Sequence, residues 1–298
     1  MERLGTVAII GVGLIGGSIG LALRARGLAE RIVGIGRHPE ALDEARRLGA
    51  IDEATTELAR GVAGADVAVV CTPVTRIVED VRLAAENGPE RLLITDAGST
   101  KRRIVEAVER DARGRGAFVA GHPIAGSERK GVAHARADLF EDRVCVLTPT
   151  GYTPGDRLAR ARAFWSSLGC RIVEMSPAAH DDALALTSHL PHAVAAALAA
   201  AIPAETLALA AGAYRDGTRV AGADAALWAG IFRENRAAVL HALTRFQDEL
   251  ARFRRALEAE DDAALRSWWD VAKGRRSRFE SPDAAGEEKG NIGPGHSV

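Results

Sequence analysis

Short apolar runs alternate with amphipathic stretches through the first 175 residues of the chain. The apolar runs lie at residues 7–10, 31–35, 67–70, 92–95, 118–119, 144–147 and 171–174. Stretches with helical periodicity lie between most of them, at residues 14–26, 39–48, 77–86, 102–110 and 156–168. Apolar strands separated by helices are typical of a parallel sheet that is covered by helices on both faces. This half of the chain is therefore predicted to be a doubly wound, mostly parallel α/β domain.

From residue 177 onward, strand-like runs end and alanine-rich helical periodicity takes over. Helices are expected at residues 178–202, 204–213, 223–257 (with one break) and 261–279. The most apolar long stretch, residues 193–213, contains Pro203 and Glu205, so we interpret it as a packed interior helix rather than a membrane span.

These textures divide the chain into three predicted parts. An α/β domain spans residues 1–175, and an all-helical domain spans residues 176–280. The last part, residues 281–298, lacks periodicity and is rich in Gly, Pro and charge, so it is predicted to be a disordered tail.

Composition narrows the class of protein. The 298 residues are 47% apolar and 27% charged, with a formal net charge of -1, which gives no reason to expect a nucleic-acid partner. The basic stretch 252–278 is interpreted as the solvated face of helices. The three cysteines, Cys71, Cys145 and Cys170, form no C-x-x-C pair. Together with the lack of a signal-peptide pattern, they favour the reducing cytoplasm and give no indication of a membrane partner.

A glycine-rich loop follows the first predicted strand. Gly11, Gly13 and Gly16 form a G-x-G-x-x-G pattern that opens the first helix. The first glycine permits a tight turn, the second allows the backbone to approach a pyrophosphate, and the third allows close packing of helix on strand. A helix N-terminus adds free N–H groups and a positive dipole end. The loop, with Leu14 and Ile15, therefore predicts a Rossmann-type dinucleotide site.

The residues after the second strand bear on which dinucleotide binds. NAD-binding domains usually carry an acidic residue there, which contacts the ribose 2′-hydroxyl. This chain has Gly36 and Arg37 instead. Because a guanidinium can donate two hydrogen bonds to a phosphate, we favour NADP over NAD. The alternative is that Arg37 is a solvated loop residue.

Three further strands end in polar or small residues. They lead into Cys71-Thr72-Pro73, into the segment Asp96 to Lys101, and into the segment Gly121 to Glu128. Ligands of open α/β sheets bind beyond the carboxyl ends of the strands, so these segments are expected to line one crevice with the glycine loop. His122 directly precedes Pro123, and a residue before proline favours an extended backbone. Ser99 precedes a predicted helix and has an N-cap as its simplest role.

A fourth polar segment, Ser188-His189-Leu190-Pro191-His192, lies in the first helix of the all-helical part. Pro191 cannot donate to the carbonyl of Thr187, so it must kink or interrupt that helix. Ser188 and His192 are four residues apart and share a helix face. Two histidines in an apolar helix indicate a polar pocket, although buried structural histidines remain an alternative. No carboxylate or thiolate stands at ligand spacing, so no metal is expected.

The sequence resembles the prephenate dehydrogenase family, which includes arogenate and cyclohexadienyl dehydrogenases. The resemblance covers residues 5 to 280. It rests on the segments G-V-G-L-I-G-G-S, C-T-P-V, T-D-A-G-S-T-K, G-H-P-I-A-G-S-E, H-D-D-A-L-A-L-T-S-H-L-P-H and D-G-T-R-V-A. It implies oxidative decarboxylation of prephenate or arogenate with hydride transfer to NAD(P), and a homodimer formed through the helical domain.

The resemblance also implies roles for individual residues. His122 matches the catalytic histidine, and Ser99 matches a serine that hydrogen-bonds both this histidine and the substrate. His192 matches a substrate-contacting histidine, and Arg219 matches an arginine that binds a substrate carboxylate. Further substrate positions are assigned to Ser188, His189, Glu128, Asp216 and Trp228, the last two as candidates to reach the pocket from a partner subunit. Cofactor positions are Gly11, Gly13, Leu14, Ile15, Gly16, Arg37, Cys71, Thr72, Pro73 and Asp96.

Alternatives remain at this stage. A β-hydroxyacid dehydrogenase would need a catalytic lysine in the interdomain helix, and residues 176–202 contain none. An imine reductase and a non-catalytic NADP-sensing protein are further alternatives. The chain departs from its apparent relatives at Gly36 and at Gly217, where an aromatic residue often precedes the Thr-Arg pair. The residues do not separate prephenate from arogenate.

Overall fold

The computed structural model describes residues 3–127 and 129–280. The chain forms two compact units that meet in sequence at Leu240 and His241. The predicted boundary at residues 175–176 falls inside the first unit, between a strand and a helix, and it stays a prediction. The predicted tail at residues 281–298 lies outside the described residues.

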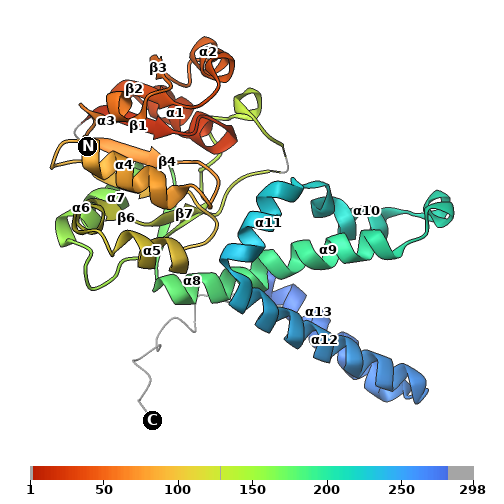
Figure 1. Ribbon diagram of the computed structural model, residues 1–298. Coiled ribbons are helices and arrows are strands. Elements are labelled where there is room, and N and C mark those ends of the chain that lie inside the picture. The colour runs from red at the N-terminus through yellow and green to blue at the C-terminus, as the bar shows by residue number, and fades with distance from the viewer. Residues whose placement is uncertain (1–2, 128, 281–298) are drawn as a thin grey trace. The chain divides into compact units, whose positions relative to one another are not determined.

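A six-stranded parallel sheet lies at the centre of the first unit (Figure 1). Its strands are β1 (Leu4–Ile10), β2 (Ala29–Ile35), β3 (Glu53–Thr55), β4 (Val67–Val70), β5 (Leu93–Asp96) and β6 (Phe118–Val119), in the order β3-β2-β1-β4-β5-β6. The helices between them are α1 (Leu14–Ala25), α2 (Pro39–Arg47), α3 (Leu58–Val62), α4 (Ile77–Asn87), α5 (Arg102–Val108) and α6 (Ala112–Ala117).

Helices cover both faces of this sheet, as the alternation of side chains in β1 shows. Val7 and Ile9 pack in one buried cluster with Ile19 of α1. The alternate residues of the strand, Ala8 and Ile10, pack in a second cluster with Ile77 and Val81 of α4. Successive side chains of a strand point to opposite faces, so each face has its own apolar core. The predicted doubly wound α/β class is confirmed.

A second, three-stranded sheet differs from the expectation of one continuous sheet. It contains β7 (Gly121–Pro123), β8 (Val144–Leu147) and β9 (Arg171–Glu174), with α7 (Gly155–Ser167) before β9. β7 pairs antiparallel with β8, and His122 lies opposite Val146. The three residues of β7 are too few to show an alternating pattern, so the sequence did not predict this strand.

The helical segment of the first unit begins with α8 (Pro177–Leu184), a π-helical turn η2 (Ala185–His189) and α9 (Leu190–Ala201). The short elements η3 (Ala204–Leu209), α10 (Gly212–Thr218), η4 (Arg219–Gly222) and α11 (Ala225–Glu234) follow. The π turn ends two residues before Pro191, whose missing N–H interrupts the helical hydrogen bonds as predicted.

The interior position predicted for residues 193–213 is wrong for the single chain. Ala195 is the one buried residue of α9, and α9 is followed by short 3-10 and α segments rather than a continuous helix. Residues Pro177–Ala201 are long and apolar enough to cross a membrane by length and composition alone, and 22% of an 18-residue stretch within them is buried. Alanine periodicity indicates a helix but does not indicate what covers it.

The second unit consists of the greater part of α12 (Arg236–Glu258), which starts in the first unit, and of α13 (Asp262–Glu280). The rings of Phe253 and Trp268 pack with centroids 5.0 Å apart and join the two helices. Glu260 has a φ of 50° in the turn between them. The break predicted within residues 223–257 is confirmed at Asn235.

Candidate active site

The glycine loop has the geometry that a pyrophosphate needs. Gly11 has a φ of +94°, and a Cβ there would lie 2.9 Å from the carbonyl carbon of Cys71. A Cβ on Gly16 would lie 2.2 Å from the oxygen of Gly11, so only glycine fits. A Cβ on Gly13 would meet no atom within 4 Å, which leaves open space beside the N-terminus of α1. That N-terminus has no side-chain cap and no acidic residue in its first turn. Its N–H groups therefore fit a phosphate.

The other expected cofactor residues lie next to this loop. Leu14 and Ile15 are partly buried at the start of α1. Cys71 and Thr72 follow β4 and pack against Gly11, and the Thr72 hydroxyl donates to Asp80 Oδ2 at 2.6 Å. Pro73 is exposed. A hypothetical Cβ on Gly126, four residues after His122, lies 3.9 Å from Ile15 Cδ1. The predicted segments thus meet at the carboxyl ends of the strands.

The end of β2 is open to solvent. Arg37 is exposed in the bend that follows Ile35. A Cβ on Gly36 would approach Leu42 at 3.2 Å, which is a tight contact. Because residue 36 is glycine, no carboxylate extends from the position that usually contacts the ribose hydroxyls.

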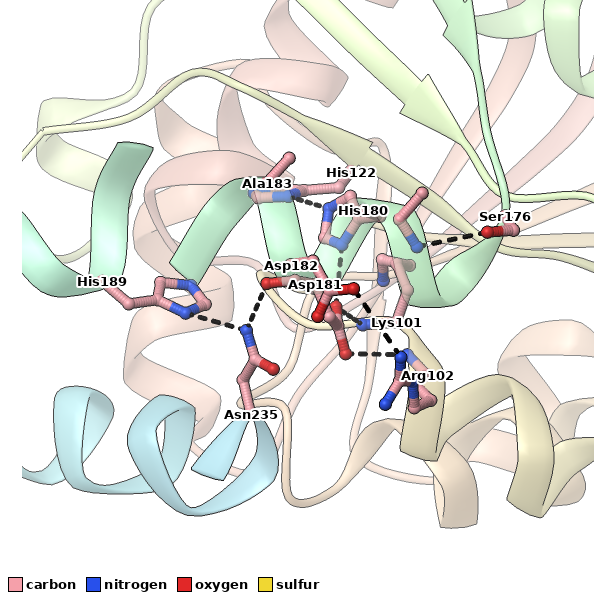
Figure 2. Close-up of polar contacts among 12 residues, drawn as sticks. Lys101, Arg102, His122, Ser176, His180, Asp181, Asp182, Ala183, His189 and Asn235 are labelled. Carbon is pink, nitrogen blue, oxygen red and sulfur yellow. Dashed lines mark hydrogen bonds and ion pairs between the residues drawn. The ribbon is translucent and has the colours of Figure 1, made fainter. Parts of the chain in front are cut away.

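His122 lies in β7 with 8% of its surface exposed. Its Nδ1 lies 2.8 Å from Nε2 of His180, a residue of α8 (Figure 2). Burial lowers the pKa of His122 well below 6.5, and the nearby charges of His180, Lys101 and His189 lower it further. His122 is therefore a neutral imidazole at neutral pH, as a general base must be.

Asp96 is fully buried, and its carboxylate is occupied by the protein itself. Oδ1 accepts from the backbone N–H of Gly121 at 3.0 Å, and Oδ2 accepts from Gly98 N–H at 2.9 Å. The ammonium of Lys101, also fully buried, forms an ion pair with Oδ2. These bonds tie the end of β5 to Gly121, the residue that precedes His122. The cofactor role expected for Asp96 stays a prediction.

Ser99 differs from both of its expected roles. α5 starts at Arg102 with Lys101 as its N-cap residue, so Ser99 is not the cap. Ser99 is partly buried, and among the described residues it makes no hydrogen bond with His122. Instead, Nδ1 of His122 is bonded to His180.

The S-H-L-P-H segment forms a polar cluster with α11. The ring of His192 stacks on Trp228 with centroids 3.7 Å apart, and its Nδ1 donates to the carbonyl of Ser188 at 2.9 Å. His189 lies edge-on to the same tryptophan at 6.0 Å. Nδ1 of His189 lies 3.2 Å from the amide nitrogen of Asn235, and its Nε2 is buried without a hydrogen-bond partner among the described residues.

The remaining predicted substrate residues lie apart from the buried centre. Arg219 is exposed in η4, and its charge contributes to lowering the pKa of His192, after burial as the main cause. Asp216 is 78% exposed and pairs with Arg215 at 3.5 Å. Glu128 lies outside the described residues.

Sequence reasoning missed four buried polar residues whose contacts begin at His122 and extend away from it: His180, Asp181, Lys101 and Asn235. His180 Nδ1 contacts Asp181 Oδ1 at 2.8 Å, and the Asn235 amide donates to the carbonyl of Asp181 at 2.7 Å. His180 and Asp181 stand in the quoted H-D-D segment, which was the available signal. Within the described residues, no group of three or more His, Cys, Asp or Glu is arranged to hold a metal.

Comparison with known proteins covers both parts of the chain. The family profile "Prephenate dehydrogenase, nucleotide-binding domain" matches residues 19–174, and "Prephenate dehydrogenase, dimerization domain" matches residues 176–270. A prephenate dehydrogenase of Bacillus subtilis is 36% identical over 278 residues, which are 91% of this chain and 75% of that protein.

A cyclohexadienyl dehydrogenase of Zymomonas mobilis is 33% identical and covers 90% of this chain and 94% of its own length. Among solved structures, prephenate dehydrogenase from A. aeolicus in complex with hydroxyphenyl propionate and NAD+ superposes with a TM-score of 0.87. It has 32% identity and covers 93% of this chain and 99% of its own. The two profiles together include β7 and the S-H-L-P-H segment.

Proposed function

This chain belongs to the prephenate dehydrogenase family, and on that premise we propose that His122 is the general base of its reaction. The chain is a nicotinamide-dependent oxidoreductase that oxidatively decarboxylates prephenate, arogenate or both. The single observation that carries the assignment is the buried His122 in β7, whose pKa is lowered by burial and whose segment reaches Ile15 at the glycine loop through Gly126. Elementary chemistry then requires a base for the hydroxyl proton of the substrate.

The reaction requires His122 to accept one proton from the substrate and to return it later. A nicotinamide cofactor bound at the glycine loop would supply the hydride acceptor for the hydroxyl-bearing ring carbon, C4. His122 removes the proton of that hydroxyl through Nε2, so the C4–O bond becomes a carbonyl. Cleavage of the bond to the ring carboxylate releases CO2, and its electron pair makes the ring aromatic. The resulting phenolate takes its proton back from His122, so the base is neutral again at the end.

Substrate binding is assigned to the cluster around His192. Because Nδ1 of His192 donates to the Ser188 carbonyl, Nε2 is the free acceptor of the neutral ring. Trp228 fixes the plane of this ring by stacking. Arg219 supplies a guanidinium for a substrate carboxylate, a pairing that is favoured by two parallel charge-assisted hydrogen bonds. Ser99, which is partly buried in the loop after β5, is proposed to contact the substrate.

We further propose that NADP is the preferred cofactor. Arg37 is exposed immediately after β2, and Gly36 carries no acid that would repel a 2′-phosphate. The NAD+ in the A. aeolicus complex belongs to that protein. In this chain, the absent carboxylate and the adjacent guanidinium favour the phosphorylated cofactor.

We also propose a homodimer in the cytoplasm. The second matched profile is described as a dimerization domain. Large apolar side chains of the helical segment are exposed in the single chain, including Leu198 at 41%, Leu207 at 43% and Leu209 at 88%. A second copy would cover such a surface. The three free cysteines are compatible with a reducing compartment.

The test is the appearance of reduced cofactor with prephenate or arogenate, each paired with NAD+ or NADP+. A rate with either substrate supports the assigned reaction, and a higher kcat/KM with NADP+ supports the role of Arg37. Arg37→Glu should then reverse the cofactor ratio. If folded protein that binds cofactor gives no rate with any of the four pairs, the proposed function is wrong.

A further inference from the structure

His122, His180 and Asp181 form a line of buried polar groups joined by hydrogen bonds, and His180 and Asp181 have no assigned role in the reaction. His180 is 0% exposed, Asp181 is 2% exposed, and both belong to α8. Figure 2 shows the order of contacts, from His122 through the ring of His180 to the carboxylate of Asp181. Buried polar groups cost free energy unless they are hydrogen-bonded, so this arrangement constrains the protons on all three residues.

The carboxylate of Asp181 is the fixed end of the line. Oδ1 accepts from the backbone N–H of Lys101 at 2.7 Å, and Oδ2 accepts from that of Arg102 at 3.0 Å. Burial alone would raise the pKa of Asp181, but the hydrogen bonds from His180, Lys101 and Arg102 lower it overall. Asp181 is therefore ionised, and an ionised carboxylate can only accept hydrogen bonds.

The ionised carboxylate of Asp181 determines which nitrogen of each histidine ring carries the proton. Nδ1 of His180 must carry a proton in order to bond to Asp181, so Nε2 of the neutral ring is an acceptor. The 2.8 Å contact between His180 Nε2 and His122 Nδ1 then requires a proton on Nδ1 of His122. In neutral His122, Nε2 is consequently the unprotonated nitrogen.

We propose that His180 and Asp181 are positioning residues that hold His122 in the tautomer with a free Nε2 and stabilise the imidazolium formed when Nε2 takes up a proton. This inference rests on the proposed function of His122. When His122 accepts the substrate proton, its Nδ1–H donates more strongly to His180 Nε2. The positive charge is then shared toward the Asp181 carboxylate. The proton returns from Nε2 to the phenolate, so the line ends each turnover in its starting state.

A structural role for the same residues is the competing explanation. Asp181 accepts the first N–H groups of α5, so it also connects α8 to α5. A purely structural pair would affect the free energy of unfolding without affecting the tautomer of His122. The experiment must therefore read the tautomer directly as well as the rate.

The first measurement is 15N NMR of the histidine side chains in the full-length wild-type protein without substrate, with His122→Asn used to assign the resonance of residue 122. We expect an unprotonated Nε2 and a protonated Nδ1 on His122. A proton on Nε2 would overturn the proposal even if the enzyme is active. If the enzyme is inactive on both substrates but the tautomer is as expected, the positioning stands and the function of His122 fails.

The second measurement compares His180→Gln with His180→Leu. Glutamine can place an acceptor oxygen near the position of the imidazole Nε2, whereas leucine has none. We expect kcat to decrease by no more than about tenfold for His180→Gln and by on the order of 100-fold for His180→Leu. KM should be nearly unchanged in both variants.

The matched control is Ser176→Ala, which removes the side-chain cap of α8 and leaves the line intact. It should lower Tm and keep kcat. If His180→Leu behaves like this control, with kcat within about threefold of the wild type, the role of His180 is only structural. If His180→Leu does not fold, the wild-type tautomer and His180→Gln still decide the question.

Discussion

At the residue scale, the imidazole of His122 combines burial with a pKa that is held low. Burial and the neighbouring His180, Lys101 and His189 all favour its neutral form. We therefore predict that His122→Asn lowers kcat by about 10²–10⁴-fold and changes KM little, because a general base acts mainly in the transition state. Steady-state rates at saturating cofactor measure this, with cofactor affinity as the control. A kcat within a few-fold of the wild type would remove His122 from the chemistry.

Arg219 should show the opposite kinetic pattern. A charge-assisted hydrogen bond to a carboxylate contributes about 1.5–3 kcal/mol, so Arg219→Ala should raise KM by roughly 10- to 100-fold and affect kcat less. Arg219→Lys keeps the charge but not the paired donors, and it should give an intermediate KM. The KM values of the three proteins with one substrate decide this, and equal values would exclude Arg219 from substrate binding.

How much of the site the sequence could predict depends on the range of each contact. Gly11, Cys71 and His122 could be assigned to one crevice because strand ends of a parallel sheet share an edge. His180 and Asp181 could not, because the partner of His180 is 58 residues away in the chain. Spacing identifies contacts within a helix, whereas only the packing of α8 beside β7 brings these rings together.

At the element scale, long helices and strands could be predicted from the sequence, whereas very short ones could not. The longer helices of the α/β domain follow from clear periodicity, and the bounds of α1, α2, α4, α5 and α7 were predicted within two residues, as were those of β2 and β4. β1 begins three residues before its predicted start, and the short helices α3 and α6 were not predicted. β3 and β7 have three residues each, so they were not predicted. Pro191 predicted an interruption of its helix but not a π turn, since several local geometries can replace one missing hydrogen bond.

The buried ion pair between Lys101 and Asp96 connects β5, the start of α5 and β7. Removing one member of a buried pair leaves an unpaired charge and typically costs about 3–5 kcal/mol. We predict a loss of this size in the free energy of unfolding for Lys101→Met, measured by urea denaturation. The double variant Asp96→Asn with Lys101→Met should recover part of it. If the double variant is as unstable as the additive sum, the two side chains do not interact.

At the scale of the whole molecule, the helical segment exposes more apolar surface than a lone chain needs. We predict that light scattering during size exclusion gives twice the chain mass of 31.4 kDa. Leu198→Glu together with Leu209→Glu should shift the protein toward the monomer, because a charge would have to lose its water at the interface. The control Leu48→Glu changes an exposed leucine of the α/β domain and should leave the mass unchanged. A monomeric wild type would contradict the proposed dimer.

The buried histidines also make the stability of the whole fold depend on pH. Burial is the main cause that lowers the pKa of His122, His180, His189 and His192. For His189 the pKa falls from 6.5 to about 4. Below pH 6.5 the unfolded chain therefore binds protons that the folded chain excludes. The stability from these neutral rings is fully present above pH 6.5 and is lost as the pH falls toward the folded pKa values.

For His189 alone, the difference between 6.5 and about 4 corresponds to roughly 3 kcal/mol. We predict that the free energy of unfolding decreases by at least this order between pH 7 and pH 4.5, measured by urea denaturation at constant ionic strength. His189→Gln cannot titrate, so its stability should depend less on pH over the same interval. An equal slope for His189→Gln and the wild type would mean that His189 is already protonated in the fold or does not control this transition. The remaining slope in His189→Gln would then report on His122, His180 and His192, whose pKa values are also lowered mainly by burial.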